Sequence, residues 1–572
     1  MADFVPPIQD MLATLRSSAD LDGLLSLPAF ADCDLDLTES VLTEAGKLAS
    51  EVIAPLNQIG DRQGSVLENG VVRTPDGWRD AYGHFVDGGW NGLSHHTDHG
   101  GQGLPQVLAM AVQEMLHGAN MAFGLCPLLN QGAVELLQTH GSPEQKATYL
   151  PKLVSGTWTG TMNLTEPQAG SDLGALAARA WRENGHYRIK GQKIYISYGE
   201  HDLTENIVHM VLARLDDAPP GSRGISLFIV PKFLPGEDGS PGQRNDLRCV
   251  SLEHKLGIHA SPTCTMAFGD GEGAIGFLVG EENRGLACMF TMMNNARIAV
   301  GVEGVGVGER AFQRAQAYAN ERIQGKAFGA DREGPIVRHP DVRRMLASMH
   351  ARTEAMRALA YAAGAQLDLA AHAESEAAQQ RAQERLDLFT PLVKAWCTDM
   401  AEKVASTGIQ VHGGMGYIEQ TGAAQHLRDV RITQIYEGTN GIQAGDLVFR
   451  KVARDGGSAA RKLIDEIEHA SPDLKRAHDA LRRATGWIVQ TVEKAPEQVA
   501  AASVPYLDLF ASVVAGSLLS KTSRHSADEA TGRRKSAAAQ FFAATDLVKV
   551  DGLAETVMMG SGALDAYADL LD

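Results

Sequence analysis

QIYEGTNGIQ, residues 434–443, places one carboxylate, Glu437, among apolar side chains and glycines. Ile435 and Tyr436 come directly before it, and Gly438 comes directly after it. The stretch is typical of a helix end that runs into a turn. A carboxylate beside aromatic and aliphatic groups loses hydration, which raises its pKa and makes it a stronger proton acceptor. The pattern therefore predicts that Glu437 is a general base, with a solvated helix-terminal glutamate as the alternative.

Length and charge limit the classes of protein that the chain can be. Its 572 residues leave room for three or four domains, and 44% hydrophobic residues can supply their cores. The formal net charge is -18, from 52 Lys and Arg against 70 Asp and Glu. This balance argues against nucleic acid or an anionic membrane as the main partner.

Cysteine usage and hydropathy indicate a cytoplasmic protein. The 6 cysteines contain no C-x-x-C pair, so neither a disulfide framework nor a zinc site is expected. The start of the chain, MADFVPPIQDMLATL, lacks the basic and apolar segments of a signal peptide. The most apolar stretch, residues 506–519, is interrupted by Asp508 and is shorter than the roughly 20 residues of a membrane span. We therefore expect a reducing compartment and no membrane span.

The hydrophobic period changes twice along the chain. Helical spacing dominates the first part, and short, alternating, β-branched segments such as HYRIKGQKIYIS and NIVHMVLARL follow from about residue 158. Helical spacing rich in Ala and Leu returns near Leu286. The predicted fold is multidomain α+β: a helical leader (1–37), an N-terminal helical domain (38–157), a central β-barrel-like or sandwich domain (158–280), a C-terminal four-helix bundle with the base (281–450), and an appended helical domain (460–572).

Two further patterns suggest sites but favour simpler interpretations. His95, His96 and His99 could suggest a metal ligand set, but they lie in a Gly-rich stretch without helical spacing, so a loop that opens a helix is preferred. GVGERA, residues 306–311, matches a dinucleotide-binding pattern. No βαβ unit surrounds it, and the neighbouring glycines are spaced to fit one close-packed helix face. We predict neither a metal site nor a dinucleotide fold.

Three motifs together are far more specific than any one of them. MNLTEPQAGSDLGAL (162–176) enters the predicted β domain, GGMGYIEQ (413–420) precedes the base by about twenty residues, and YEGT contains Glu437. Together they resemble the acyl-CoA dehydrogenase family over about residues 40–450. The chain is most similar to larger members with a C-terminal extension, a group that includes 3-methylthiopropionyl-CoA dehydrogenases and broad-chain relatives.

The resemblance implies a reaction with FAD as cofactor and an acyl-CoA thioester as substrate, as in fatty acid β-oxidation. Glu437 would accept the α proton while the β hydride passes to flavin N5, which gives a trans-2-enoyl-CoA. In the family, the base's own backbone N–H and a flavin ribityl hydroxyl hold the thioester oxygen. One such donor is worth roughly 3 kcal/mol. Electrons would leave through an electron-transfer flavoprotein.

The family's functional positions carry over to matching residues of this sequence. The flavin ring would lie against Met162, Leu164, Thr165, Tyr195 and Ser197, and Thr439 would meet FAD phosphate or ribose. FAD of a neighbouring subunit would be reached by Arg322, Gln410, Gly413 and Gly414, which implies a homo-oligomer of at least two chains. The substrate side would comprise Ser171 and Arg297 toward CoA, with Tyr436 and Gly438 near the acyl group.

The sequence also departs from the family pattern and leaves alternatives open. Gly325 stands at the usual aromatic position after Arg322, and Pro340 stands where glutamine is expected, which affects the adenine-side contacts. Rival functions are an acyl-CoA oxidase, a DNA-associated alkylation-response flavoprotein of the same fold, and a catalytically silent assembly partner. Short, methylthio, long and aryl acyl groups all stay open, because pocket depth depends on facing helices.

Overall fold

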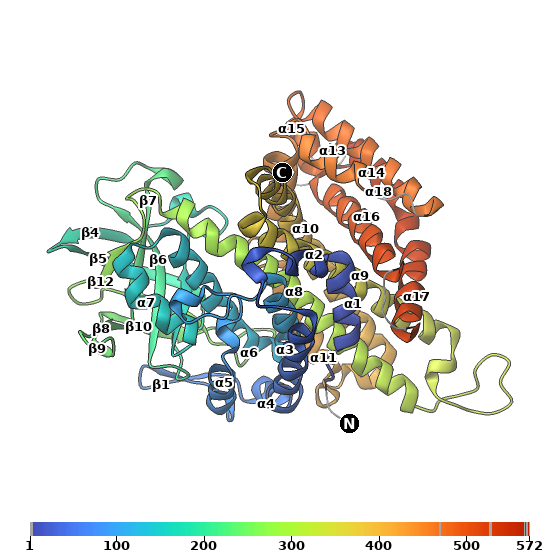
Figure 1. The fold of residues 1–572 in the computed structure, drawn as a ribbon, viewed down its shortest axis with the longest axis horizontal. Helices are drawn as coiled ribbons and strands as arrows, with labels where there is room; N and C mark the ends of the chain where they lie inside the picture. The colour runs from blue at the N-terminus through green and yellow to red at the C-terminus, as the bar shows by residue number, and fades with distance from the viewer. Residues whose placement is uncertain (1–3, 468–470, 525–528, 566, 568–569, 571–572) are drawn as a thin grey trace. The chain divides into compact units, whose positions relative to one another are not determined.

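The computed structural model describes residues 4–467, 471–524, 529–565, 567 and 570 (Figure 1). Parts of the predicted leader (1–3) and of the predicted extension (468–470, 525–528 and the last few residues) lie outside the described residues. The chain forms two compact units. The bundle unit comprises residues 1–46, 105–118 and 297–572, and the sheet unit comprises residues 47–104 and 119–296. The domain boundaries expected from the sequence, after residues 37, 157, 280 and 450, remain predictions.

The helices of the sheet unit surround a cluster of aromatic rings. Phe123 makes edge contacts with Trp78 and Phe85, with ring centroids 6.1 and 6.4 Å away. A capping box between Ser142 and Gln145 starts α7, because each side chain binds the other's backbone N–H. The elements of this part are α4 (Leu56–Gln63), the hairpin β1 (Val66–Glu68) and β2 (Val71–Arg73), α5 (Trp78–Asp87), the second part of α6 (Gln106–His140), and α7 (Pro143–Ser155).

The sheet of this unit closes partly on itself. Its strands run in the order β10-β11-β5-β12-β7-β6-β3, and β4 pairs with both β5 and β6. The ring β5-β12-β7-β6-β4 is therefore closed, which confirms the predicted barrel-like β domain. The strands are β3 (Trp158–Asn163), β4 (Arg179–Glu183), β5 (His186–Ser197), β6 (Asn206–Leu215), β7 (Ile225–Pro231), β10 (Leu247–Leu252), β11 (Thr263–Phe268) and β12 (Ala274–Leu278), with a separate pair β8 (Phe233–Pro235) and β9 (Pro241–Arg244).

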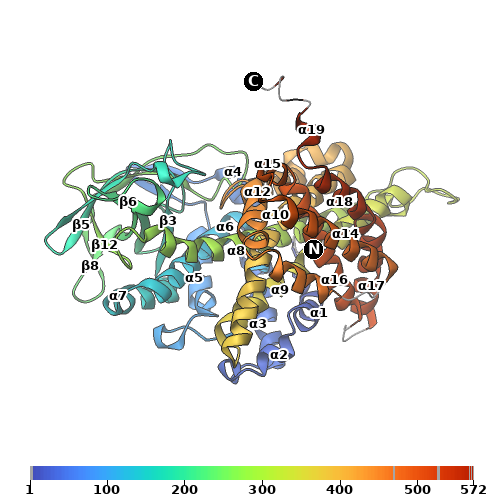
Figure 2. The same cartoon turned by 90° about the horizontal axis from the view of Figure 1, so that it is seen from above.

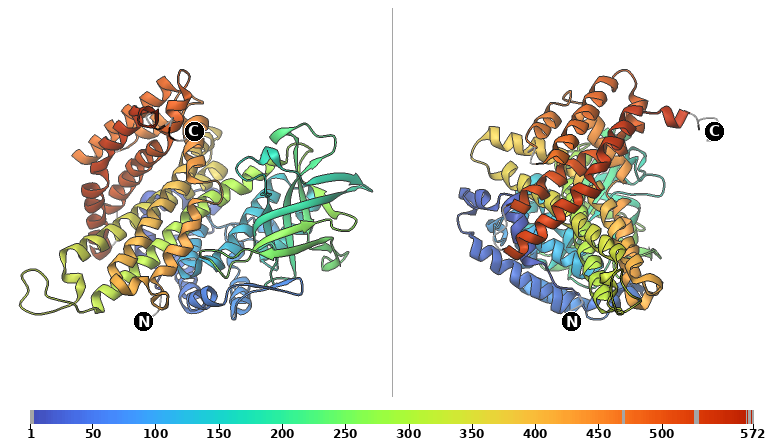
Figure 3. Two further views of the ribbon diagram at one scale, coloured as in Figure 1. Left: turned by 180° about the vertical axis from the view of Figure 1, so that it is seen from behind. Right: turned by 90° about the vertical axis from the view of Figure 1, so that its right-hand side faces the viewer.

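Long helices form the centre of the bundle unit. They are α8 (Gly285–Glu321, in this unit from Arg297), α9 (Pro340–His372) and α10 (Glu376–His412), followed by the short α11 (Ala423–Val430). In Figure 3, α9 and α10 run side by side. A Cβ on Gly301 would lie 2.3 Å from Val393 Cγ1, and one on Gly308 would lie 3.1 Å from Met356 Cε. These glycines therefore allow close helix packing, as predicted, and α8 is continuous through residues 306–311.

The predicted extension is helical, and its helices α16 and α17 pack against α9 of the bundle. Among the described residues, α16 is long and apolar enough to cross a membrane, but 67% of its most apolar window is buried inside the fold. It packs beside α14, α17 and α18 (Figure 2). The helices are α12 (Asn440–Gly445), α13 (Ser458–Asp465), α14 (Pro472–Thr491), α15 (Pro496–Ala501), α16 (Ser503–Arg524), α17 (Glu529–Thr545), α18 (Val550–Met559) and α19 (Gly562–Asp565).

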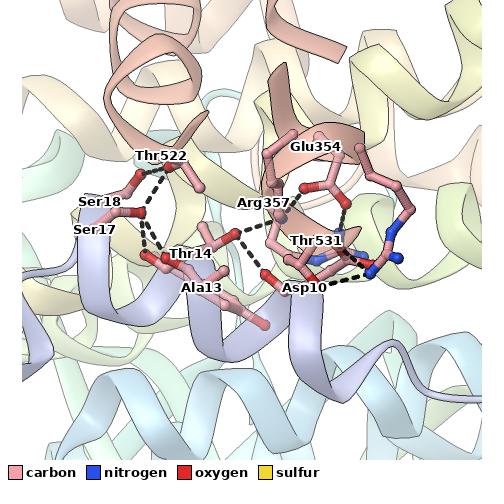
Figure 4. Close-up of polar contacts among 12 residues, drawn as sticks. Asp10, Ala13, Thr14, Ser17, Ser18, Glu354, Arg357, Thr522 and Thr531 are labelled. Atoms are coloured by element: carbon pink, nitrogen blue, oxygen red, sulfur yellow. Dashed lines mark hydrogen bonds and ion pairs between the residues drawn. The ribbon is translucent and has the colours of Figure 1, made fainter. Parts of the chain in front are cut away.

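The start of the chain packs against this extension through polar contacts (Figure 4). Its helices are α1 (Ile8–Ser18), α2 (Leu21–Leu25) and α3 (Leu35–Lys47). The Ser17 and Thr522 hydroxyls lie 2.8 Å apart, and Lys535 Nζ donates to Thr14 Oγ1 at 2.9 Å. The two ends of the chain thus belong to one packed structure in the bundle unit.

Candidate active site

Glu437 lies in a strained turn between two helical segments. A 3-10 helix, Arg431–Gln434, ends just before it, and Thr439 caps α12 by accepting from the Ile442 N–H at 3.3 Å. The turn is made by Glu437 at φ +57° and Gly438 at φ +85°. A left-handed conformation costs a residue with a side chain roughly 1–2 kcal/mol, so surrounding contacts must hold Glu437 in place.

The backbone of Glu437 is held through its carbonyl group. Gln443 Nε2 donates to this carbonyl at 3.1 Å, and Arg297 Nε donates to it at 3.4 Å. In the described part of the chain, nothing accepts a hydrogen bond from the Glu437 N–H. The two hydrogen bonds fix the Glu437–Gly438 peptide, and the N–H of the preceding Tyr436–Glu437 peptide can donate to another molecule.

The charges around Glu437 have opposing effects on its carboxyl. Burial raises the pKa of Glu437 above its ordinary value, while the Arg297 guanidinium and the Lys394 ammonium favour the ionised form. Burial also lowers the pKa of Lys394 to about 8. Burial thus raises the pKa of Glu437 and makes its carboxylate a stronger proton acceptor, while the two cations partly offset this rise.

A second carboxyl lies close to Glu437. The Tyr436 hydroxyl donates to Glu303 Oε2, and Glu303 is fully buried on α8. Burial raises the pKa of Glu303 to about 8, although the hydrogen bond from Tyr436 opposes the shift. Glu303 therefore keeps its proton at neutral pH.

Asn440 joins the base turn to α10. Its side chain accepts from Lys394 Nζ at 2.9 Å and donates to Asp399 Oδ1 at 2.8 Å. Sequence reasoning missed this second layer, which consists of Glu303, Lys394, Asp399, Asn440 and Gln443. A signal was present for two of them, because GVEGVGVG and LVKAWC each place one lone charge in an apolar helix.

The predicted flavin-side residues lie together in the sheet unit. Met162 is on β3, Tyr195 and Ser197 are on β5, and Leu164 and Thr165 follow β3. The Ile194 N–H donates to Thr165 O at 2.9 Å, and Thr161 Oγ1 donates to Ser197 O at 2.7 Å. These hydrogen bonds hold the C-terminal end of β3 next to the C-terminal end of β5.

The groups at this place suit a flavin ring. Tyr195 has φ +61° and is 61% exposed, so an aromatic face is open. The Thr165 and Ser197 hydroxyls have no hydrogen-bond partner among the described residues. An open aromatic face with two available hydroxyls matches a flat heteroaromatic ring with a polar edge, so the residues present fit FAD.

The loop that carries Thr165 is anchored from behind by a buried ion pair. Glu166 accepts from Lys193 Nζ at 2.8 Å and from the Ala177 N–H at 2.6 Å. Burial alone would raise the pKa of Glu166, but Lys193 and the backbone N–H groups outweigh it and lower this pKa. Ser171, predicted on the CoA side, is exposed in the same unit. Glu437 and the flavin-side residues belong to different units.

The residues predicted to reach a neighbouring subunit lie far from Glu437 along the bundle. The Tyr318 and His412 rings stack with centroids 4.4 Å apart, which brings the end of α8 next to the end of α10. Arg322, Gln410, Gly413 and Gly414 are exposed at this end. At 1.5 Å per residue, the α8 axis from Arg297 to Glu321 measures roughly 36 Å.

Family models match consecutive parts of the chain. The acyl-CoA dehydrogenase N-terminal domain matches residues 38–157, its middle domain 161–270 and its C-terminal domain 283–451. An acetyl-CoA dehydrogenase C-terminal-like domain matches residues 452–566. The chain belongs to the acyl-CoA dehydrogenase family and is an FAD-dependent oxidoreductase that acts on acyl-CoA.

One relative and two solved structures are similar to this chain over most of its length. The 3-methylmercaptopropionyl-CoA dehydrogenase of Ruegeria pomeroyi is 49% identical over 527 residues, which cover 89% of each chain. Caenorhabditis elegans ACDH-11 in complex with C11-CoA matches with a TM-score of 0.79 at 21% identity, covering 100% of this chain and 95% of that one. A Bacillus anthracis acyl-CoA dehydrogenase complexed with FAD has a TM-score of 0.75 at 22% identity, covering 96% and 92%. Because both identities are low, we conclude from these two structures only that the fold is shared.

Proposed function

We propose that the protein converts an acyl-CoA to its trans-2-enoyl-CoA, with Glu437 as the acceptor of the α proton. The observation that carries this proposal is the turn itself. It combines a carboxyl with a raised pKa, two nearby cations, Arg297 and Lys394, and a backbone N–H without an acceptor in the described residues.

The residues of the turn have separable roles in this mechanism. The Glu437 carboxylate takes the α proton, and its N–H donates to the thioester oxygen as negative charge develops there. Arg297 and Gln443 hold the turn on the C-terminal side of Glu437, because both donate to the Glu437 carbonyl. FAD, when bound, accepts the β hydride. Met162, Leu164, Thr165, Tyr195 and Ser197 would hold its ring, and Thr439 would contact its phosphate or ribose. Arg322, Gln410, Gly413 and Gly414 would contact the FAD of the neighbouring subunit.

The substrate we propose is 3-methylmercaptopropionyl-CoA or a linear acyl-CoA of medium or greater length. The first choice rests on the relative from Ruegeria pomeroyi. Tyr436 and Gly438 would contact the acyl group, and Ser171 would contact the CoA side. Because the reaction acts at Cα and Cβ only, the acyl chain beyond Cβ can vary without change to the proposed chemistry.

The partners we propose are a second copy of this chain and an electron-transfer flavoprotein in the cytoplasm. The second copy is supported by the roughly 36 Å of α8 between Arg297 and its C-terminal end, where Arg322 follows. Arg297 and Arg322 are too far apart to be explained easily as parts of one site. They are better explained as parts of two different sites in one assembly. Sedimentation of the holoenzyme as a monomer would contradict this part of the proposal.

The base assignment is tested by anaerobic mixing of the holoenzyme with 3-methylmercaptopropionyl-CoA, butyryl-CoA and octanoyl-CoA. We expect at least one of them to bleach the wild-type flavin and to give the 2-enoyl-CoA by mass. Glu437→Gln should slow bleaching by about 10²–10⁴-fold, the usual contribution of a positioned base. Glu493→Gln, the same substitution at an exposed residue, is the matched control.

Two outcomes of this experiment would contradict the proposal. Bleaching of Glu437→Gln at the wild-type rate would show that another group takes the proton. Stoichiometric hydrogen peroxide from wild-type turnover in air, with no electron transfer to an added electron-transfer flavoprotein, would instead indicate an oxidase.

A further inference from the structure

Glu303 is a buried carboxyl that the proposed mechanism does not use. It lies on α8, six residues after Arg297, and is 0% exposed. Its Oε2 accepts from the Tyr436 hydroxyl, while its Oε1 is buried without a hydrogen-bond partner in the described residues. A carboxyl that is only half satisfied in a protein interior is costly, so its presence needs a reason.

The position of Glu303 suggests that reason. The dipeptide Tyr436–Glu437 is tied to α8 at two points, through Glu303 at the Tyr436 side chain and through Arg297 at the Glu437 carbonyl. Between these points Glu437 has φ +57°. Strained backbone persists only where surrounding contacts determine it, and these two contacts lie on either side of the strained residue.

We propose that Glu303 is a positioning residue for α-proton abstraction, which holds the Tyr436 phenol and thereby keeps Glu437 in its left-handed conformation. The inference rests on the proposed role of Glu437 as the base. It adds a residue on another helix that controls the direction of the base without touching the substrate. Small errors in such direction cost large factors in rate, because proton transfer needs close and aligned groups.

The charges that face Glu303 are compatible with this role. Tyr436 and Glu437 lie on the turn, and Lys394 is on α10. Burial keeps Glu303 protonated below about pH 8. It can therefore hold Tyr436 without adding a second full negative charge next to the base. A glutamine at this position would keep the acceptor oxygen, whereas a leucine would remove it.

The test compares Glu303→Leu, Tyr436→Phe, their double variant and Glu303→Gln in single-turnover flavin reduction. The probe is 3-methylmercaptopropionyl-CoA or octanoyl-CoA, whichever reduces the wild-type flavin faster. We expect the rate constant of Glu303→Leu and of Tyr436→Phe to fall by about 10–100-fold, with apparent Kd for the acyl-CoA within about threefold of wild type. The double variant should be no slower than either single one, because both remove the same contact. Glu303→Gln should stay within about threefold of wild type.

Three results would overturn the inference: near-wild-type rates in Tyr436→Phe, a loss confined to Kd, or additive losses in the double variant. If Glu303→Leu does not fold, Tyr436→Phe and Glu303→Gln decide alone, because each keeps the shape of the original side chain. Glu437→Gln is run in parallel. If it is as fast as wild type, the proposed function has failed; if it is slow while Tyr436→Phe is not, only this inference has failed.

Discussion

Two clusters of buried charge in the bundle unit differ in how completely their groups are paired. In the first, Arg357 donates to Glu114 at 2.8 Å and to Glu309 at 2.7 Å, and also contacts Glu354. Lys535 contacts the second oxygen of Glu354. We call this set the Arg357 network. Every member is almost completely buried, and each charge has an opposite charge beside it.

The second cluster surrounds Glu437 and leaves several groups without partners. Glu303 Oε1 and Gln443 Oε1 are buried without a hydrogen-bond partner, and the Glu437 N–H has no acceptor in the described residues. Glu437 itself is in a strained conformation. A saturated network fixes helices against one another, whereas a site keeps donors and charge available for a substrate. The Arg357 network therefore matches a role in packing, and the Glu437 cluster matches the proposed role in catalysis.

The largest effect on stability should come from breaking the Arg357 network. Lys535→Met removes the cation beside the second oxygen of Glu354 and leaves a buried charge less compensated, which should cost about 3–5 kcal/mol of unfolding free energy. Lys549→Met is the matched control, because Lys549 is 60% exposed and its ion pair with Asp546 should contribute at most about 1 kcal/mol. Thermal unfolding of the holoenzymes measures the difference.

The pH dependence of this effect follows from Glu354. Burial alone would raise its pKa, but Lys535 and Arg357 outweigh burial and lower the pKa to about 2. A carboxyl with a lowered pKa stabilises the fold above its ordinary pKa of 4.5, and this contribution is lost as pH falls toward 2. The gap between Lys535→Met and wild type should therefore narrow in acid. A gap that widens below pH 4 would contradict the assignment.

A smaller effect, on catalysis, should come from Lys394. Its ammonium group favours the ionised form of Glu437, so Lys394→Met should raise the pKa of Glu437 further. The acid limb of flavin reduction should then move to higher pH, and the rate at pH 8 should fall by less than about tenfold. Lys403→Met, on the exposed face of the same helix, is the control. An acid limb that stays in place would show that Lys394 does not act on the base.

Local sequence signals predicted much of the fold. The alternating segments became β5 and β6, and the glycines of α8 allow close packing of its neighbours, as expected. The hairpin β1–β2 was missed, although Asn69-Gly70, both with positive φ, is a strong signal for such a turn. Each of these strands has only three residues, which is too few to change the helical spacing of hydrophobic residues around them.

The sequence predicted Glu437 and Arg297 from motifs and family resemblance, but it missed the charged groups that other helices bring to Glu437. The apolar residues around Glu437 predicted its raised pKa, as the structure has it. Its role as a base was predicted from the three motifs together and stays a prediction. Glu303 and Lys394 come from two other helices, 134 and 43 residues earlier in the chain. Their distance from the base is set by helix packing, for which single-sequence spacing gives no rule. Lone charges in apolar helices indicate only that some partner exists.

The difference between the two clusters is tested most directly by thermal unfolding and flavin reduction of Glu437→Gln and Lys535→Met at pH 7.5. Because burial raises the pKa of Glu437, its carboxylate destabilises the fold above the ordinary pKa, so Glu437→Gln should unfold at or above the wild-type midpoint while flavin reduction falls at least about 100-fold. Lys535→Met should unfold several degrees lower, and its remaining folded enzyme should reduce flavin within about threefold of the wild-type rate. A Glu437→Gln enzyme that is both less stable and fully active, or a Lys535→Met enzyme that is stable and slow, would contradict the account.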